Sequence, residues 1–484
     1  MYFRKEKEMR KTKIVCTLGP ASSSEEVIAE MLRAGMNVAR FNFSHGTHES
    51  HAELIDAFRR VRDDLGVPAA VLIDTKGPEI RFGDFEGGSV ELVEGEHFVM
   101  TTETVTGNAA RGTITYKGLP HCVKEGDRIV ADDGALSFKV VGTTDTEIEC
   151  IIIDGGKLKT HKSVNVPGIA LDMPFIDEKD KSDLLFAIEH DVDFVAASFV
   201  RSAADVIEMR KFLDYNGGHD IKIISKIENM QGVDNFDEIL ENSDGIMVAR
   251  GDMGVEVPFE RLPGLQKRFI RRCYQSGKMV ITATQMLESM IVNPTPTRAE
   301  ITDVANAVFD GTSAVMLSGE SAVGSFPVEA IKTMAMIAEQ AEKDAFEMNV
   351  YKGIGHDPDM LDITNAICDA TCTSAHDLGV AAIIAVTLRG HTARRMSKFR
   401  PEEPIVAATP MLKTFHQLAL SWGVYPVLAR YITSSDELFV HAVDCAKQID
   451  VVKNGDKVVV TAGIPLQTSA ATNVLRVQVV GERF

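Results

Sequence analysis

"IKIISKIENMQG", residues 221–232, joins a short apolar run to a lysine and a glutamate that are separated by one isoleucine. The run has the length and the β-branched composition of a buried strand. Side chains two positions apart on a strand point to the same side, so Lys226 and Glu228 share one face at the end of this strand. An isolated solvated ion pair contributes only ~0 to 1 kcal/mol. The neighbouring strands therefore decide what this pair does.

Similar apolar runs alternate with amphipathic helical stretches, a rhythm typical of parallel β/α units. The runs are "KIVCTL" (13–18), "MNVARFN" (36–42), "AAVLID" (69–74), "DFVAASF" (193–199), "IKIIS" (221–225), "GIMVA" (245–249), "MVITA" (279–283) and "SAVML" (313–317). Eight such units predict an α/β fold, a (β/α)8 TIM barrel with its active site at the carboxyl ends of the strands. From about Phe82 to Val166, Gly-punctuated alternating segments predict an all-β lid domain inserted after strand 3.

Bulk composition limits the class of protein. A length of 484 residues predicts two to four domains, and we expect three. No stretch approaches the ~18 apolar residues of a membrane helix, and the charged N-terminus lacks a secretion signal, which predicts a cytoplasmic protein. A net charge of −19 argues against nucleic-acid or anionic-membrane partners. Seven cysteines without C-x-x-C predict reduced thiols, with Cys368 and Cys372 in core packing.

Polar side chains follow strand after strand, so they converge on one rim of the predicted barrel. In chain order they are Arg40, Asn42, Ser44, Asp74, Thr75, Lys76, Arg81, Lys226, Glu228, Arg250, Asp252, Thr284, Ser318 and Glu320. Two carboxylates, Glu228 and Asp252, suit a magnesium ion that keeps water and substrate oxygens. The cations Arg40, Lys226 and Arg250 suit phosphate or carboxylate oxygens. Positioning and charge neutralisation are what phosphoryl transfer needs, and this set supplies both.

A second ion is suggested by the segments "NFSH" (42–45) and "DTKGPE" (74–79). Asn42, Ser44, Asp74 and Thr75 offer oxygen donors that together carry one negative charge. That charge is low for a divalent ion, so the set favours a monovalent cation.

Six segments closely resemble the motifs of the pyruvate kinase family, in order and across nearly the whole chain. They are "ARFNFSHGTHESH" (39–51), "LIDTKGPEIR" (72–81), "SKIENMQGVDNFDEIL" (225–240), "IMVARGDMGVEV" (246–257), "TATQMLESM" (282–290) and "LSGESAVGSFP" (317–327). The resemblance implies a barrel domain A (1–77 and 167–350), a lid domain B (78–166) and a C-terminal α/β domain C (351–484). It also implies a homotetramer that transfers phosphate from phosphoenolpyruvate to ADP and then protonates enolpyruvate to pyruvate.

The same resemblance implies roles for individual residues. Glu228 and Asp252 match the magnesium ligands, Lys226 matches the lysine beside the transferring phosphoryl group, and Asn42, Ser44, Asp74 and Thr75 match the potassium ligands. Arg40 and Arg81 match basic residues near the phosphates, and His45 matches a nucleotide contact. The backbone at Ala249, Arg250 and Gly251, together with Thr284, matches the part that holds the substrate carboxylate. The proton donor stays open between Thr284, Ser318 and a bound water.

Two positions depart from the pattern of some family members. Ser202 stands where similar animal enzymes carry a lysine, which affects part of the nucleotide phosphate contact. Glu79 stands where other members carry a lysine that supplies its own positive charge, so we expect activation by potassium.

"AVTLRGHTARRMSKFRP", residues 385–401, predicts an effector site for a phosphorylated activator. Thr387, Arg389, Gly390, His391 and Thr392 lead into a helix, whose N-terminus attracts phosphate; an ordinary capped turn is the alternative. Regulated family members bind a sugar phosphate at the matching loop. Residues 437–457 lack the tryptophan and arginine that grip the second phosphate of fructose 1,6-bisphosphate in members similar to the animal enzyme. The bisphosphate, a sugar monophosphate and AMP remain open.

Two other functions are compatible with parts of this pattern. A magnesium-dependent lyase for pyruvate-like acids would not need the lid or the lysine. A catalytically silent sugar-phosphate sensor would not need Lys226, Glu228, Asp252 and Thr284 together.

Overall fold

The central unit is a closed barrel of parallel strands in the order β1-β17-β16-β15-β14-β13-β3-β2. We describe residues 9–169, 171–351, 362–465 and 471–482 of a computed structural model. The barrel strands are β1 (Lys13–Thr17), β2 (Val38–Asn42), β3 (Ala70–Asp74), β13 (Phe194–Ala197), β14 (Lys222–Ile227), β15 (Gly245–Ala249), β16 (Met279–Ala283) and β17 (Ala314–Leu317). Each lies within one of the eight predicted runs, except that β14 extends to Ile227. The predicted (β/α)8 TIM barrel is confirmed.

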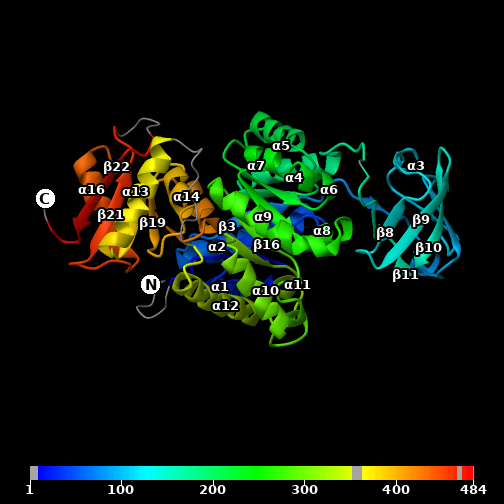
Figure 1. Ribbon diagram of the computed structural model, residues 1–484, viewed down its shortest axis with the longest axis horizontal. Coiled ribbons are helices and arrows are strands. Elements are labelled where there is room, and N and C mark those ends of the chain that lie inside the picture. The colour runs from blue at the N-terminus through cyan, green and yellow to red at the C-terminus, as the bar shows by residue number, and fades with distance from the viewer. Residues whose placement is uncertain (1–8, 170, 352–361, 466–470, 483–484) are drawn as a thin grey trace.

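Helices surround the barrel and cover its outer face (Figure 1). The longer ones are α1 (Glu25–Ala34), α2 (His48–Leu65), α4 (Glu178–Glu189), α5 (Ala203–Tyr215), α9 (Leu262–Gln275), α10 (Arg298–Phe309) and α12 (Pro327–Glu347). Shorter helices are α6 (Met230–Asp234), α7 (Phe236–Asn242), α8 (Arg250–Glu256) and α11 (Gly319–Ala322). α10 shows how the sequence sets their limits: Thr297 and Glu300 form a reciprocal capping box at its N-terminus. Its buried face, Val304, Ala307 and Val308, repeats at helical spacing.

The lid lies between β3 and β13 and has its own hydrophobic core, which includes Phe82, Phe98 and Phe138. Its main sheet has the order β4-β12-β8-β9-β10-β6-β7, beside a separate pair, β11-β5. The strands are β4 (Ile80–Arg81), β5 (Ser89–Leu92), β6 (His97–Thr101), β7 (Arg111–Thr113), β8 (Arg128–Ala131), β9 (Leu136–Thr143), β10 (Glu147–Asp154), β11 (Gly156–Lys159) and β12 (Ser163–Asn165). A 3-10 turn (Glu86–Gly88) and a short helix, α3 (Leu119–Cys122), interrupt the otherwise β structure.

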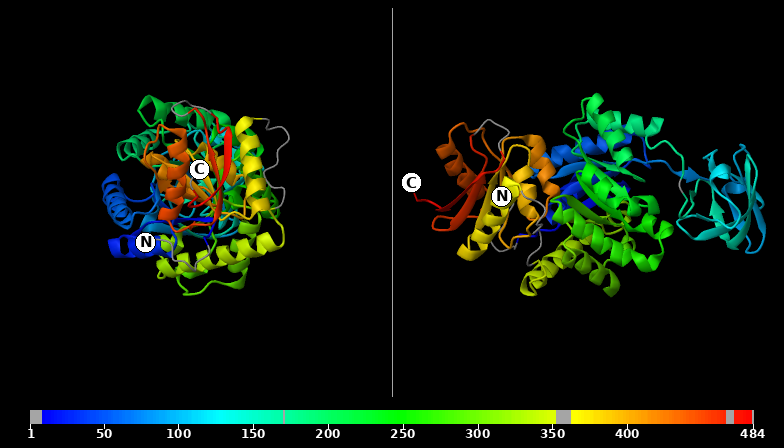
Figure 2. Two further views of the ribbon diagram at one scale, coloured as in Figure 1. Left: turned by 90° about the vertical axis from the view of Figure 1, so that its left-hand side faces the viewer. Right: turned by 45° about the horizontal axis from the view of Figure 1, so that its top comes forward.

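The C-terminal unit is a five-stranded sheet in the order β20-β19-β18-β21-β22, with helices packed on it. β22 runs antiparallel to β21, and the other neighbours are parallel. The strands are β18 (Ala382–Val386), β19 (Ile405–Thr409), β20 (Val424–Leu428), β21 (Lys457–Ala462) and β22 (Val474–Val479), and the helices are α13 (Ile363–Leu378), α14 (His391–Ser397), α15 (Leu412–Gln417) and α16 (Ser435–Gln448). This unit and the lid lie at opposite ends of the barrel (Figure 2).

The cysteines and the helices agree with the compositional predictions. All seven cysteines are free thiols. Cys368 is fully buried in a cluster of the C-terminal unit, and Cys372 packs against it. Across the part of the chain that the structure describes, every helix is too short or too polar to span a bilayer.

Candidate active site

Lys226 and Glu228 are not a solvated surface pair. The Nζ atom of Lys226, at the end of β14, lies 2.8 Å from Oε1 of Glu228 and 3.2 Å from Oδ1 of Asp74, at the end of β3. Both acids are only 1% exposed. Ser198, just after β13, accepts a hydrogen bond from Lys226 Nζ at 2.8 Å and donates one to Thr75 O at 2.7 Å. Ion pairs this deeply buried are costly to desolvate, so their presence at the barrel mouth points to function.

Arg40 completes this buried group, which we call the mouth cluster (Arg40, Asp74, Ser198, Lys226 and Glu228). Its Nε donates to Asp74 Oδ2 at 2.7 Å, and its Nη1 donates to Thr17 Oγ1 at 2.8 Å. Asp74 therefore lies between two cations from different strands, which fixes the orientation of both.

Burial and neighbouring charges act against each other within the mouth cluster. Burial favours the neutral form of Lys226, yet the nearby carboxylates of Asp74, Glu228 and Asp252 outweigh it and raise the lysine pKa. Burial would likewise raise the pKa of Asp74, but Lys226 and Arg40 together lower it. Glu228 is different: burial is the larger effect and raises its pKa to about 8, although Lys226 opposes that shift. The cluster thus holds the protonated ammonium of Lys226 beside Glu228, and the positive charge of Lys226 does not fully offset the effect of burial on that carboxyl group.

Glu228 has an oxygen suited to a cation. Its Oε2 accepts a hydrogen bond from Phe199 N at 2.6 Å. Its Oε1 is buried and lies 2.8 Å from the ammonium of Lys226. Asp252 lies in the first turn of α8, the helix that follows the neighbouring strand β15. Its charge acts on Glu228. Within the described ranges no group of three or more His, Cys, Asp or Glu could hold a metal. A divalent ion here would therefore take two protein carboxylates and complete its shell with other oxygens, which fits magnesium.

The four oxygen donors predicted to bind a monovalent cation lie on adjacent strands. Asn42 pairs with Asp74 in the register of β2 and β3. Ser44 N donates to Asn42 Oδ1 at 3.1 Å, and Thr75 Oγ1 donates to Ala196 O at 3.3 Å. The structure therefore places Asn42, Ser44, Asp74 and Thr75 in one neighbourhood beside the mouth cluster.

The segment after β15 is fastened to the loop after β16. Gly251 N donates to Thr284 Oγ1 at 2.8 Å, and that hydroxyl donates to Ala283 O at 2.7 Å. Thr284 and Gln285 have φ values of 67° and 53°, a left-handed conformation that is unfavourable for residues with side chains. Strain of this kind is typical of functional loops and fixes the position of the threonine hydroxyl.

The structure corrects one expectation about Arg250. Its guanidinium was expected to stand by the metal as a cation for substrate oxygens. Instead, Nη1 contacts both oxygens of Asp303 at 2.7 and 2.8 Å, Nε donates to Ala283 O at 3.2 Å, and Nη2 donates to Thr284 O. The acid and the two carbonyls hold the side chain against the loop after β16, because β15 and β16 are neighbours. Arg250 therefore positions this segment, and only its backbone remains a candidate for ligand binding.

A cleft of about 340 Å³ lies between the lid and the barrel mouth, and its walls include His45, Glu79, Arg81 and Asp252. Arg81 Nε donates to Glu79 Oε2 at 2.8 Å, and Arg81 Nη1 donates to His161 O at 2.9 Å. The predicted nucleotide residues His45 and Arg81 thus share a cleft with a predicted metal ligand. The negative charge of Glu79 is already paired with Arg81.

Ser318 and Ser202 each lie at the start of a helix that follows a barrel strand. Ser318 N donates to Glu320 Oε2 at 2.8 Å, and the other carboxylate oxygen accepts from Leu287 N at 3.1 Å, so Glu320 joins the loops after β16 and β17. Ser202 is the N-cap of α5 but makes no side-chain capping bond.

The predicted effector loop is ordered by its own hydroxyls. Thr387 Oγ1 accepts from Gly390 N at 3.0 Å, and the hydroxyls of Thr392 and Thr472 lie 2.6 Å apart. Arg389 and His391 are exposed. α14 has only seven residues. The two hydroxyls are therefore engaged within the protein, and the expected contribution of a long helix dipole is small.

Ser198 and Asp303 were missed by the sequence prediction. Ser198 ends the fourth strand, so its position at a strand end was an available signal. Asp303 lies within α10, where nothing in the sequence distinguishes it from a solvated helical acid.

Comparison with known proteins agrees with this fold. A model of the pyruvate kinase barrel domain matches residues 9–331, and a model of the pyruvate kinase alpha/beta domain matches residues 365–478. Pyruvate kinase of Clostridium acetobutylicum is 49% identical over 475 residues, which cover 98% of this chain and 100% of that protein. Pyruvate kinases of Staphylococcus haemolyticus and Geobacillus stearothermophilus are each 48% identical over 98% of this chain and 81% of their own length. The fold and the comparisons define a barrel phosphotransferase. The chain belongs to the pyruvate kinase family.

Proposed function

We propose that this chain transfers the phosphoryl group of phosphoenolpyruvate to ADP, which gives pyruvate and ATP in glycolysis, and that it depends on Mg²⁺ and K⁺. The mouth cluster is the observation that carries this proposal: a buried lysine lies between the carboxylates of Asp74 and Glu228 at the carboxyl ends of the barrel strands. Phosphoryl transfer needs mainly positioning and charge neutralisation. The family membership and the names of the relatives support the same reaction.

Each residue of the site has a proposed task. Lys226 neutralises the transferring phosphoryl group, and Asp74 and Ser198 hold its ammonium in place. Glu228 and Asp252 hold magnesium, which supplies charge neutralisation for phosphate and enolate oxygens when bound. Asn42, Ser44, Asp74 and Thr75 hold potassium. Arg40, His45 and Arg81 contact the nucleotide phosphates.

The substrate carboxylate is proposed to bind the backbone at Ala249, Arg250 and Gly251, with Thr284 beside it. The hydrogen bond from Gly251 N to Thr284 Oγ1 brings these groups together. Thr284, Ser318 or a water molecule delivers the proton to enolpyruvate. We divide the chain at 77/78, 166/167 and 350/351 into domains A, B and C, and we propose a cytoplasmic homotetramer.

The test is pyruvate formation from phosphoenolpyruvate with and without ADP. Pyruvate that appears only with ADP supports the kinase. Pyruvate without ADP would indicate the magnesium-dependent lyase, and no turnover in either case would indicate the sugar-phosphate sensor.

We also propose that a phosphorylated metabolite activates the enzyme at Thr387, Arg389, Gly390, His391 and Thr392. The exposed Arg389 and His391 beside the ordered turn support this site. A ligand that binds one quaternary state better than another would shift the balance between them.

The measurement is the phosphoenolpyruvate saturation curve with fructose 1,6-bisphosphate, a sugar monophosphate or AMP, in wild type and in Arg389→Ala/Thr392→Ala. Thr472→Ala is the matched control, because it removes the partner of Thr392 but leaves Arg389. Activation by none of the ligands, or equal activation in the double variant, would place the effector elsewhere.

A further inference from the structure

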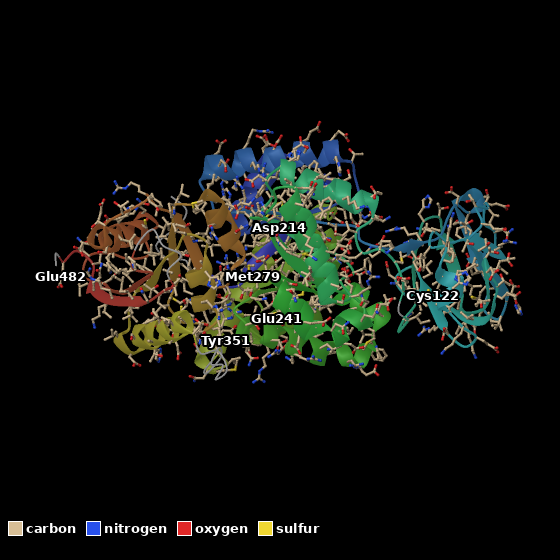
Figure 3. The ribbon with its side chains drawn as sticks, turned by 90° about the horizontal axis from the view of Figure 1, so that it is seen from above. Cys122, Asp214, Glu241, Met279, Tyr351 and Glu482 are labelled. Carbon is tan, nitrogen blue, oxygen red and sulfur yellow. The ribbon has the colours of Figure 1, made fainter. Side chains whose placement is uncertain are left out.

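The amino-terminal end of the barrel meets the C-terminal unit at a small cavity of about 10 Å³, which we call the basal cavity. Its walls include Lys278 from the barrel side and Arg394, Lys398, Arg400, Ser421 and Trp422 from the C-terminal unit. Met279, another wall residue, is labelled in Figure 3 where the two units meet. This volume accommodates one water molecule or one monatomic ion.

Four polar atoms of the cavity walls have no hydrogen-bond partner in the described part of the chain. They are Arg394 Nη1, Arg400 Nε, Ser421 Oγ and Trp422 Nε1. All are buried, and Arg400, Ser421 and Trp422 are only 3%, 2% and 0% exposed. Buried polar groups almost always have partners, so four unpaired ones around one cavity indicate a missing ligand. The guanidinium and indole nitrogens can only donate, so the ligand must accept.

The cavity walls are also strongly positive. Arg394 and Arg400 contribute guanidinium groups to them, and none of the wall residues, all of which the structure describes, carries a carboxylate. The remaining donors of Arg400 go to uncharged groups, with Nη1 2.6 Å from Ser397 O and Nη2 2.8 Å from Gly311 O. Burial lowers the pKa of Arg400 to about 10 and also lowers that of Arg394, which Asp244 only partly offsets. An uncompensated buried charge is costly, and a bound anion removes that cost.

Water satisfies this site less well than a halide. A water molecule accepts two hydrogen bonds and must place its own two protons, whereas three wall groups here only donate. The small size of the cavity favours a monatomic anion over a polyatomic one. We propose that the basal cavity binds a single monatomic anion of the chloride class, which fastens the C-terminal unit to the base of the barrel.

Trp422 makes the proposal directly testable, because it is the only tryptophan of the chain. Its indole N–H belongs to the site, and its ring stacks 4.6 Å from the Arg400 guanidinium. The fully buried ring is shielded from collisions with solutes. Bromide bound in the cavity should therefore quench its fluorescence along a saturable curve, in a titration at constant ionic strength against gluconate after dialysis free of halide.

Arg400→Gln should abolish the saturable quenching of Trp422 fluorescence by bromide. Ser421→Ala, a smaller change that keeps the charge of the cavity, should weaken that quenching. Arg268→Gln is the matched control, because Arg268 is an exposed arginine of α9 whose side chain is 49% exposed, and it should leave the curve unchanged. A linear, shallow curve that is the same in wild type and Ser421→Ala would overturn the proposal. So would diffraction from bromide-grown crystals with no anomalous peak between Arg400 and Trp422, which would assign the cavity to water.

Discussion

The mouth cluster and the basal cavity lie at opposite ends of one barrel and treat buried charge in opposite ways. At the mouth, Lys226 lies within 3.2 Å of Asp74 and Glu228, and Arg40 is fixed on Asp74. At the base, the buried guanidinium of Arg400 donates to carbonyls and leaves one nitrogen without a partner. At the mouth, the carboxylates are already placed to hold a cation. At the base, the unpaired donors are already placed for the anion that we propose.

The difference between paired and unpaired buried charges indicates which end of the barrel is suited to catalysis. Paired charges at the mouth are held in position before substrate arrives, which is what electrostatic catalysis requires. Unpaired charges at the base have no reactive group near them and lie at the end of the barrel where stability, not chemistry, is normally decided. We therefore propose a catalytic task for the buried cations at the mouth and a structural task for those at the base.

The largest expected effect is at the mouth. Lys226→Met should lower turnover on the order of 10³-fold or more, because a positioned cation at the transferring phosphoryl group has an effect of that size. Glu228 can take up a proton when the lysine is removed, so the protein should remain folded. The measurement is turnover together with a thermal melting curve.

Lys222→Met is the matched control, at the other end of the same strand. Lys222 contacts Asp244 at 3.0 Å and lies outside the mouth cluster. Turnover close to wild type in folded Lys226→Met would remove the lysine from the mechanism and break the comparison between the two ends.

Glu228→Gln should weaken magnesium binding by roughly tenfold or more and lower activity with it, because affinity depends on the charge of the ligands. The amide keeps the shape and can still accept from Phe199 N. A magnesium titration of activity measures the change. Glu260→Gln is a useful control, since that acid is exposed. An unchanged titration in Glu228→Gln would contradict the assignment of this ligand.

The sequence predicted the barrel because each of its strands is apolar on both faces and ends in polar residues. Asn42, Asp74, Lys226 and Glu228 could be found by their positions at strand ends. The locking of Arg250 on Asp303 could not, because it joins a strand end to a helix 53 positions away and depends on side-chain direction. The basal cavity was equally hidden, since Arg400 and Trp422 come from separate turns that only the packed units bring together.

Potassium dependence tests the remaining part of the mouth. Activity should fall several-fold in a tetramethylammonium buffer free of sodium and potassium if, as we propose, Asn42, Ser44, Asp74 and Thr75 bind a monovalent cation. Glu79→Lys should reduce that requirement by supplying a positive charge. Full activity without potassium would refute the idea.

The ion pair between Glu79 and Arg81 calls for a second variant. Glu79→Gln removes that pair but adds no positive charge, so it should leave the potassium requirement in place. If Glu79→Gln relieved the requirement as well as Glu79→Lys, the freed Arg81, not the new lysine, would be the cause.

The smallest effect is expected at the base of the barrel, at Asp193, which precedes β13. Burial raises its pKa to about 6, although Lys413 of the C-terminal unit, 3.9 Å away, opposes the shift. A carboxyl pKa that is higher in the folded than in the unfolded protein stabilises the fold in acid, and this contribution is lost as the pH rises through about 6. Asp193→Asn keeps an acceptor for Val71 N, which now donates to Asp193 Oδ2 at 2.8 Å. It should therefore raise the free energy of unfolding by about 1 kcal/mol at pH 7 and have almost no effect near pH 4.

Denaturant midpoints at the two pH values measure this, with Asp191→Asn as the control, because Asp191 also contacts Lys413 but its side chain is 82% exposed. Destabilisation by Asp193→Asn at pH 7 but not near pH 4 would instead show that its charge is needed by Lys413, and that the base, like the mouth, holds its buried charges in pairs.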